Sequence, residues 1–247
     1  MKVLVIPDIH LQPWIFQAAD YIMERYNYDR IVILGDIVDS HGDSGKDLTL
    51  YYNTLETALK FAKKYSSKLT WLLGNHEVGY ASWKCVCSEH NYEAEPMVKD
   101  YFREICKVLG KSTLIAARID NLIFSHAGFT EIRATFYGSY ARDTSLGVLD
   151  RMIDGVNQVR YETLWEPQSP IWYRPSSMVV PYDTAPYLQV VGHTPVKTPY
   201  VFHNMLLTDT FWAEGMNVFP VIDSVDKEVM WLTADGDALG AILPKNS

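Results

Sequence analysis

Hydrophobic residues along the chain fall into short runs that are typical of buried strands. The runs are rich in β-branched and aliphatic residues, and most of them end at a small or polar residue. They cover residues 2–6, 30–34, 69–73, 121–124 and 187–191. Between the first three runs, apolar residues recur with the period of a helix over residues 14–26 and 47–65. This alternation predicts βαβ units, in which helices join parallel strands.

The pattern changes after about residue 204. Three closely spaced strand candidates follow, with turn residues between them, over residues 205–208, 217–222 and 228–233. They predict a β-meander, so the second half is expected to be more α+β than doubly wound. Two earlier stretches, 77–111 and 129–186, are rich in polar or aromatic residues and show no clear period. We interpret them as excursions above the strand ends.

The length and composition favour one folded unit. At 247 residues, the chain is close to the upper end of what one hydrophobic core organises. Apolar residues make up 48% of it, which excludes a disordered chain. No internal repeat, low-complexity tract or Gly/Ser linker divides the sequence. We therefore predict a single domain over residues 1–247.

Several features predict a cytoplasmic protein without membrane association. No apolar run exceeds four residues, whereas a membrane-spanning helix needs about 20. Asp8 follows the first apolar run so closely that it leaves no room for the apolar centre of a signal peptide. Three cysteines, Cys85, Cys87 and Cys106, are too few and odd in number for a disulfide framework. This cysteine usage agrees with a reducing compartment.

The charge balance is acidic. Against 22 Lys and Arg residues stand 30 Asp and Glu residues, which gives a net charge of −8. No segment concentrates basic residues as a protein that binds a nucleic-acid backbone would, so duplex nucleic acid is not an expected partner. A surplus of carboxylates is also typical of metal sites, where the ion offsets their charge.

Side chains of the types that bind metals follow five of the predicted strands. The residues are Asp8 and His10 after the first strand, Asp36 and Asp39 after the second, Asn75 and His76 after the third, His126 after the fourth and His193 after the fifth. In α/β sheets the carboxyl ends of the strands form the ligand crevice. We therefore expect these groups to converge, because a core has no reason to collect so many polar side chains at one edge.

The types of side chain narrow the choice of metal. Carboxylate, imidazole and amide groups without thiolate suit Mn²⁺, Fe or Zn²⁺ rather than a structural zinc site rich in cysteine. Six of these eight side chains, namely two aspartates, three histidines and an asparagine, are already more ligands than one catalytic ion uses. A pair of ions about 3.5 to 4 Å apart can share a carboxylate and hold a phosphate during an in-line displacement. The set therefore predicts two divalent ions, with Mn²⁺ favoured.

The order of the motifs resembles a known family. The blocks D-I-H, G-D-I-V-D, G-N-H-E, S-H-A-G and G-H-T-P begin at residues 8, 35, 74, 125 and 192. This order resembles the calcineurin-like metallophosphoesterases, and within them the serine/threonine protein phosphatase branch with its bacterial and phage members. A lone D-x-H is weak evidence, but G-D-x-x-D followed by G-N-H-E is specific. The resemblance implies an α/β sandwich of two mixed sheets flanked by helices, with a dimetal site at the carboxyl edge of the strands.

The resemblance also implies a role for each residue. Asp8 and His10 would bind the first ion, Asp36 would bridge both, and Asn75, His126 and His193 would complete the second site. In the family a water between the two ions attacks phosphorus as hydroxide, without a covalent enzyme intermediate. His76 would protonate the leaving oxygen, and Asp39 would orient its ring.

One motif departs from the protein phosphatase pattern. That pattern continues G-D-x-V-D with Arg-Gly, and the arginine grips the substrate phosphate, whereas this chain continues with Ser40 and His41. Arg174 lies where the family supplies another arginine that contacts phosphate, and we predict that it binds phosphate here. Arg142 is a second candidate.

The function that these features predict is metal-dependent hydrolysis of phosphate esters. The leading substrate class is the phosphomonoesters, including phosphoserine and phosphothreonine in proteins. Symmetrical cleavage of dinucleoside polyphosphates and phosphodiester hydrolysis stay open, because the arginine after Asp39 is missing. A docking module that keeps the fold without catalysis is a further alternative, but retention of His76 and Asp39 argues against it. The sequence does not indicate an oligomeric state.

Other polar residues have ordinary interpretations. Cys85 and Cys87 lack the spacing of a C-x-x-C motif, so we expect packing roles. His41, His90 and His203 match no motif of the family and are expected at the surface or as satisfied core residues.

Overall fold

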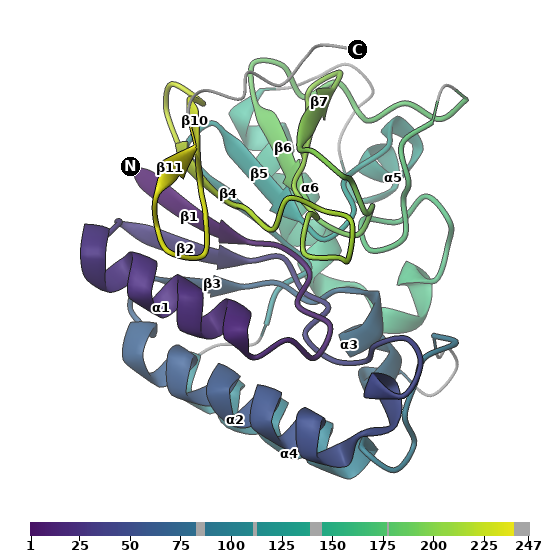
Figure 1. The fold of residues 1–247 in the computed structure, drawn as a ribbon. Helices are drawn as coiled ribbons and strands as arrows, with labels where there is room; N and C mark the ends of the chain where they lie inside the picture. Colours follow the sequence, from purple (N-terminus) through teal and green to yellow (C-terminus); the bar gives the residue numbers. More distant parts are fainter. Residues whose placement is uncertain (83–86, 111–112, 139–144, 177, 240–247) are drawn as a thin grey trace.

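The computed structural model describes residues 1–82, 87–110, 113–138, 145–176 and 178–239. Two mixed β-sheets face each other, and helices cover their outer faces (Figure 1). This architecture confirms the predicted sandwich. None of the helices in these ranges has the length and apolar content that crossing a bilayer requires.

The first sheet contains the predicted βαβ units. Its strands are β1 (Lys2–Ile6), β2 (Arg30–Ile33), β3 (Leu69–Trp71), β9 (Phe219–Asp223), β10 (Val229–Leu232) and β11 (Ala238–Leu239). They lie in the order β11-β10-β9-β1-β2-β3. The strands β1, β2 and β3 are parallel and are joined by α1 (Trp14–Tyr26) and α2 (Leu48–Tyr65). The Asp47 carboxylate accepts hydrogen bonds from the first turn of α2, so this helix begins one residue later than predicted.

The second sheet has the order β4-β5-β6-β8-β7. Its strands are β4 (Ala116–Ile119), β5 (Leu122–Ser125), β6 (Leu188–Val191), β7 (Tyr200–Phe202) and β8 (Met205–Leu207). The prediction that residues 205–208 begin a meander with the two strands that follow was wrong. Strand β8 pairs with β6 and β7, whereas β9 returns to β1 in the first sheet. Hydrophobic pattern identifies a strand but not its partner.

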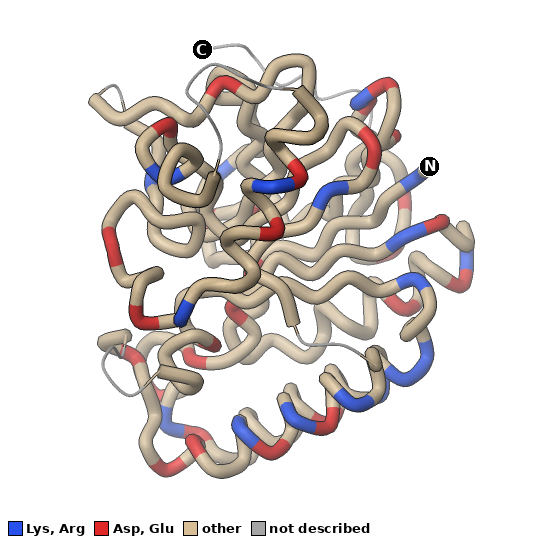
Figure 2. Tube along the Cα trace, turned by 180° about the vertical axis from the view of Figure 1, so that it is seen from behind, with Lys and Arg blue, Asp and Glu red and all other residues tan. Residues whose placement is uncertain are grey.

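The two stretches interpreted as excursions contain helices, so that interpretation was wrong in part. They include α3 (Asn75–Ala81), α4 (Glu95–Leu109), α5 (Glu131–Phe136), α6 (Leu146–Gln158) and the short 3₁₀ helix η2 (Tyr161–Leu164). A further 3₁₀ turn, η1 (Ser44–Lys46), precedes α2. Figure 2 shows charges of both signs along the helix at the bottom of the view. In α4, Val98 and Ile105 are fully buried and Tyr101, Phe102 and Leu109 pack partly buried beside them, so its apolar residues recur at helical spacing.

Alternate side chains of the strands face different layers. In β1, Val3 and Val5 join the core between the two sheets, together with Phe124 of β5. Leu4 and Ile6 face the layer formed by α1 and α2. Because both faces of the strand are buried, its sequence is an unbroken apolar run. The packed layers hold the carboxyl ends of the strands in fixed positions at one edge.

Candidate metal centre

Four side chains from loops far apart in the sequence meet at this edge. The Nε2 atom of His126, which follows β5, lies 3.1 Å from Oδ2 of Asp36 after β2. The same nitrogen lies 3.0 Å from Oδ1 of Asn75 and 3.1 Å from Nδ1 of His193, which follows β6. All four residues are buried. The predicted convergence of strand ends therefore occurs.

The tautomer of His126 shows what this cluster can bind. Its Nδ1 lies 2.9 Å from the carbonyl oxygen of Leu34, which can only accept a hydrogen bond, so Nδ1 carries the proton. In the neutral ring Nε2 then presents a lone pair, as do Oδ2 of Asp36 and Oδ1 of Asn75. Ligands about 2.1 Å from an ion and at right angles to one another lie about 3 Å apart. The cluster fits a divalent cation.

Electrostatics support the same conclusion. Burial would lower the pKa of His126, but the carboxylates of Asp36 and Asp8 outweigh it and raise the pKa to about 9. Without an ion, this cluster therefore holds a proton that a metal would displace. Burial also raises the pKa of Asp8, and the nearby charge of Asp209 adds to the effect. Carboxylates buried this close together need cations to offset their desolvation.

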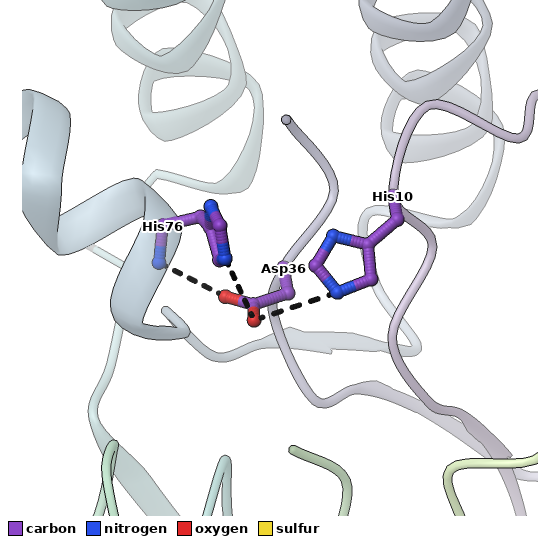
Figure 3. A group of neighbouring side chains, drawn as sticks. All are labelled: His10, Asp36 and His76. Atoms are coloured by element: carbon purple, nitrogen blue, oxygen red, sulfur yellow. Dashed lines mark hydrogen bonds and ion pairs between the residues drawn. The ribbon is translucent and has the colours of Figure 1, made fainter. Parts of the chain in front are cut away.

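A second group of possible ligands shares Asp36. Nδ1 of His10 lies 3.1 Å from the carbonyl oxygen of Asp39, so its Nε2 is free to act as a ligand. This Nε2 lies 3.8 Å from Oδ2 of Asp36 and 4.0 Å from Oδ2 of Asp8. Figure 3 shows the rings of His10 and His76 on either side of the Asp36 carboxylate. Nε2 of His76 lies 3.9 Å from the same oxygen, so His76 also borders this space.

The loops that carry these side chains have strained backbones. The φ angles of His10, Asp36, Asp39 and His193 are 44°, 49°, 62° and 60°, in the left-handed region. Each such residue costs on the order of 1 to 3 kcal/mol, so the surrounding structure must hold it. Tight turns after the strands bring the side chains back over the sheet edge. Other left-handed residues lie elsewhere in the chain, such as Asn27 at the end of α1 and Asp120 in the turn between β4 and β5.

Two glycines allow these loops to approach one another. A Cβ atom on Gly74 would lie 2.1 Å from Oδ1 of Asp36. A Cβ atom on Gly192 would lie 2.1 Å from Oδ1 of Asp8. The close approach lets the backbone N–H of His193 donate to both oxygens of Asp8 at 3.0 Å. The glycines in the G-N-H-E and G-H-T-P blocks are thus required by geometry.

Glu77, the last residue of the G-N-H-E block, fixes two of the loops and received no role from the sequence. Its buried carboxylate accepts hydrogen bonds from the backbone N–H groups of Asp36 and Ile37, both at 2.7 Å, and of Gly74 at 2.9 Å. Burial and the charge of Asp36 raise the pKa of Glu77, while these N–H groups oppose the shift. The carboxylate therefore ties the loop after β2 to the start of α3.

Replacing Glu77 with glutamine is expected to lower the free energy of unfolding by about 3 kcal/mol. The amide group of the glutamine would place its own N–H donors against the backbone N–H groups that now donate to Glu77. At least one of these backbone N–H groups would then have no acceptor. Urea unfolding measures the change. Glu104→Gln, which alters an exposed ion pair with Lys107 on α4, is the matched control. A Glu77→Gln protein within about 0.5 kcal/mol of the wild type would show that the carboxylate does not hold these loops.

His76 is oriented by a network around Asp39. Nδ1 of His76 lies 2.9 Å from Oδ2 of Asp39, whose Oδ1 accepts hydrogen bonds from the hydroxyls of Tyr51 and Tyr80. Burial would lower the pKa of His76, but the charge of Asp36 and the hydrogen bond to Asp39 raise it well above its usual value. The sequence predicted the pairing of His76 with Asp39, but no motif indicated the two tyrosines.

Arg174 and Asp209 lie beside the metal-ligand cluster. Nη1 of Arg174 donates to the carbonyl oxygen of His193 at 2.6 Å, and the rest of this exposed side chain is open to solvent. Burial raises the pKa of Asp209 to about 7, with opposing contributions from nearby charged groups, Arg174 among them. Asp209 is buried beside Asp8 and belongs to none of the five motif blocks. Arg142 lies outside the described residues.

Cys87 is buried, as expected for a packing residue, and it also contacts a candidate metal ligand. Nδ2 of Asn75 donates to its Sγ at 3.2 Å, and this contact turns Oδ1 of Asn75 toward His126. The thiol therefore helps to orient a candidate metal ligand. Cys85 lies outside the described residues.

The comparison with known families decides the assignment. The model of the calcineurin-like phosphoesterase family matches residues 1–222, which include every residue of the cluster. The chain belongs to the calcineurin-like phosphoesterase family. This phosphoesterase is therefore a metal-dependent hydrolase of phosphate esters, and its family uses a dimetal site.

Solved structures agree on the fold of this phosphoesterase. A cold-active protein-tyrosine phosphatase of a psychrophile, Shewanella sp., is 17% identical, with a TM-score of 0.57 over 96% of this chain and 79% of that chain. A serine/threonine protein phosphatase from Saccharomyces cerevisiae is 14% identical, with a TM-score of 0.52 over 90% of this chain and 72% of that chain. No curated protein matches the sequence at a significant level. At these identities, the similarity concerns the fold alone.

Proposed function

We propose that this phosphoesterase hydrolyses phosphate monoesters, with phosphoserine and phosphothreonine in proteins as the leading substrate class. The observation that carries the proposal is the hydrogen bond between His76 and Asp39 beside the metal-ligand cluster. Neither residue is needed to build that cluster, but a proton donor at this place assists the departure of a basic alkyl oxygen. A docking module would not need such a pair.

The proposed ligands form two sets that share one carboxylate. Asp8, His10 and Asp36 would hold one ion, and Asp36, Asn75, His126 and His193 would hold the other. When bound, such ions supply positive charge for a phosphate and acidify water. Oxygen and imidazole ligands suit Mn²⁺, which we propose as the working metal, with Fe and Zn²⁺ as alternatives.

In this proposal His76 acts through its Nε2 atom. Asp39 accepts a hydrogen bond from Nδ1–H, which fixes the ring and stabilises its positive charge. The His76 side chain is only 10% exposed, and its Nε2 lies 3.9 Å from Oδ2 of Asp36. The Tyr51 and Tyr80 hydroxyls hold the other oxygen of Asp39 and keep the pair rigid.

Arg174 is the proposed phosphate-binding cation. One N–H group of its guanidinium is used by His193, and the remaining donors can contact phosphate oxygens. Arg174→Ala is expected to raise KM for p-nitrophenyl phosphate by roughly tenfold without loss of metal. Steady-state kinetics with metal analysis measures the change, and Arg103→Ala on the exposed face of α4 is the control. A KM equal to that of the wild type would exclude Arg174 as the phosphate ligand.

A substrate panel with Mn²⁺ tests the proposed function. The panel contains p-nitrophenyl phosphate, bis-p-nitrophenyl phosphate, a phosphoserine peptide and a dinucleoside tetraphosphate. We expect kcat/KM to be highest for the two monoesters. Faster hydrolysis of the bis-ester or of the dinucleoside tetraphosphate would overturn the assignment as a phosphomonoesterase.

A further inference from the structure

A cavity of about 760 Å³ opens beside the proposed proton donor. Its walls are two loops, residues 40–46 directly after Asp39 and residues 88–93 before α4. The Nδ2 group of Asn91 donates to the carbonyl oxygen of Gly45 at 2.9 Å and so joins the two walls. The volume is in the range of sites that enclose a large ligand. No role in metal binding accounts for this cavity.

Tyr80 connects the cavity to the catalytic pair. Its hydroxyl donates to Oδ1 of Asp39 and accepts from the backbone N–H of Asn91 at 3.1 Å. Its ring stacks on that of His90, with centroids 4.1 Å apart. The cavity therefore lies next to the Asp39–His76 pair. One residue, Tyr80, thus separates the cavity wall from the carboxylate that orients His76.

His90, one of the residues that line the cavity, carries an unused hydrogen-bond acceptor. Its side chain is only 4% exposed, and its Nε2 lies 3.5 Å from Oε2 of Glu95. A carboxylate accepts hydrogen bonds, so Nε2 carries the proton and the neutral ring has its lone pair on Nδ1. This Nδ1 is buried and has no hydrogen-bond partner among the described residues. His90 was expected at the surface or as a satisfied core residue; its side chain is buried, but its Nδ1 is unsatisfied within the described part of the chain.

The charges that line the cavity favour a positive ligand. Glu89 and Glu93 face one lysine, Lys46, whose Nζ already lies 3.7 Å from Oδ1 of Asp43. Nδ1 of His41 lies 3.2 Å from Glu89, and within the described ranges no cation forms an ion pair with Glu93. A leaving group with further phosphates would meet two carboxylates, and the described lining offers it Lys46, already paired with Asp43, and His41, already beside Glu89. A leaving group with N–H donors would meet the two carboxylates as acceptors.

An aromatic ring completes this environment. Tyr92 is 67% exposed, and its ring meets that of His90 edge-on, with centroids 4.7 Å apart. An exposed tyrosine beside carboxylates suits a guanidinium or ammonium group, which binds the face of the ring. The face of such a ring does not attract the anionic oxygens of a phosphate group.

We propose that the cavity between residues 40–46 and 88–93 binds a basic side chain, arginine or lysine, that neighbours the phosphorylated residue of a peptide substrate. The inference rests on the proposed phosphomonoesterase function and specifies which phosphopeptides the enzyme would prefer. The size of the cavity exceeds that of a small cationic alcohol, which favours a peptide as the source of the positive charge.

Matched peptides test this inference. Three phosphoserine peptides differ only in the residues on both sides of the phosphoserine, which are arginine, alanine or glutamate. We expect kcat/KM to fall in that order, with a ratio between the arginine and glutamate peptides of roughly tenfold at low ionic strength. Because each ratio is measured on one enzyme preparation, differences in folded fraction or metal content cancel.

Variants of the lining residues locate the effect. Glu93→Gln and Glu89→Gln should each reduce the arginine-to-glutamate ratio, and the double variant should bring it close to one. Glu104→Gln, an acidic residue of α4 outside the cavity, should leave the ratio unchanged. A ratio that stays the same in the double variant would overturn the proposed site.

Other substrates separate this inference from the proposed function. Absence of hydrolysis of p-nitrophenyl phosphate with Mn²⁺ would refute the function itself. If that ester is hydrolysed but the arginine and glutamate peptides are equal, only the cavity assignment fails. Preference for phosphoethanolamine over the arginine peptide would overturn the peptide as the occupant of the cavity. Preference for a dinucleoside tetraphosphate would overturn the proposed preference of the cavity for a positively charged group.

Discussion

Asp36→Asn is expected to lower kcat for p-nitrophenyl phosphate by roughly a thousandfold, which corresponds to about 4 kcal/mol of transition-state stabilisation. Oδ2 of Asp36 faces His126 at 3.1 Å and His10 at 3.8 Å, so this one oxygen serves both proposed ligand sets. The amide of the variant lacks the negative charge at the point that both ions would share in the proposed centre. The variant should therefore also bind fewer than two Mn²⁺ ions per chain, as measured by metal analysis after dialysis.

Two further variants give this prediction a sharp comparison. Asp8→Asn removes a carboxylate from one ligand set only and should be less harmful than Asp36→Asn. Asp100→Asn, on the exposed face of α4, should leave metal content and kcat unchanged. If Asp8→Asn proves clearly worse than Asp36→Asn, Asp36 is not the bridging ligand.

His76→Asn is expected to damage phosphopeptide hydrolysis by about a thousandfold and p-nitrophenyl phosphate hydrolysis by less than about tenfold. An alkyl oxygen leaves poorly without a proton, whereas p-nitrophenolate is stable as an anion. The variant keeps every proposed metal ligand, so its Mn²⁺ content should equal that of the wild type. Values of kcat for both substrates, measured with the same enzyme preparation, check the prediction.

Asp39→Asn should show the same selectivity in milder form, because it removes the charge that orients the His76 ring at 2.9 Å. Tyr101→Phe, which removes a hydroxyl that donates to Glu56 away from the cluster, is a control with no expected selectivity. Equal losses for both substrates in His76→Asn, with metal retained, would mean that His76 positions the phosphate instead of donating a proton.

Features that depend on local pattern could be predicted from the sequence. The first five apolar runs contain buried strands, because both faces of each strand pack against another layer. The polar residues that follow them lie together, because the carboxyl ends of these strands meet at one edge. The grouping of Asp36, Asn75, His126 and His193 therefore needed no tertiary information. Their role as ligands, and the organisation as a single domain, stay predictions.

Features that depend on distant partners could not be predicted. Strands β8 and β9 are both short, buried apolar runs, but the sheet that each joins is decided by pairing. Helix α4 is an exception, because its apolar residues recur at helical spacing and could have been recognised in the sequence. Glu77 satisfies backbone N–H groups 40 residues and more away in sequence, and no local pattern marks such a contact. The unpartnered Nδ1 of His90 is visible only in the folded chain.

Anomalous diffraction at the manganese edge, from crystals grown with Mn²⁺, tests the proposed centre most directly. Two peaks per chain are expected, one among Asp36, Asn75, His126 and His193, and one bounded by Asp8, His10 and Asp36. A single peak at full occupancy would contradict the dimetal centre, and a second ion bound by His76 in place of Asp8 would contradict both the ligand set and the role of His76 as the proton donor.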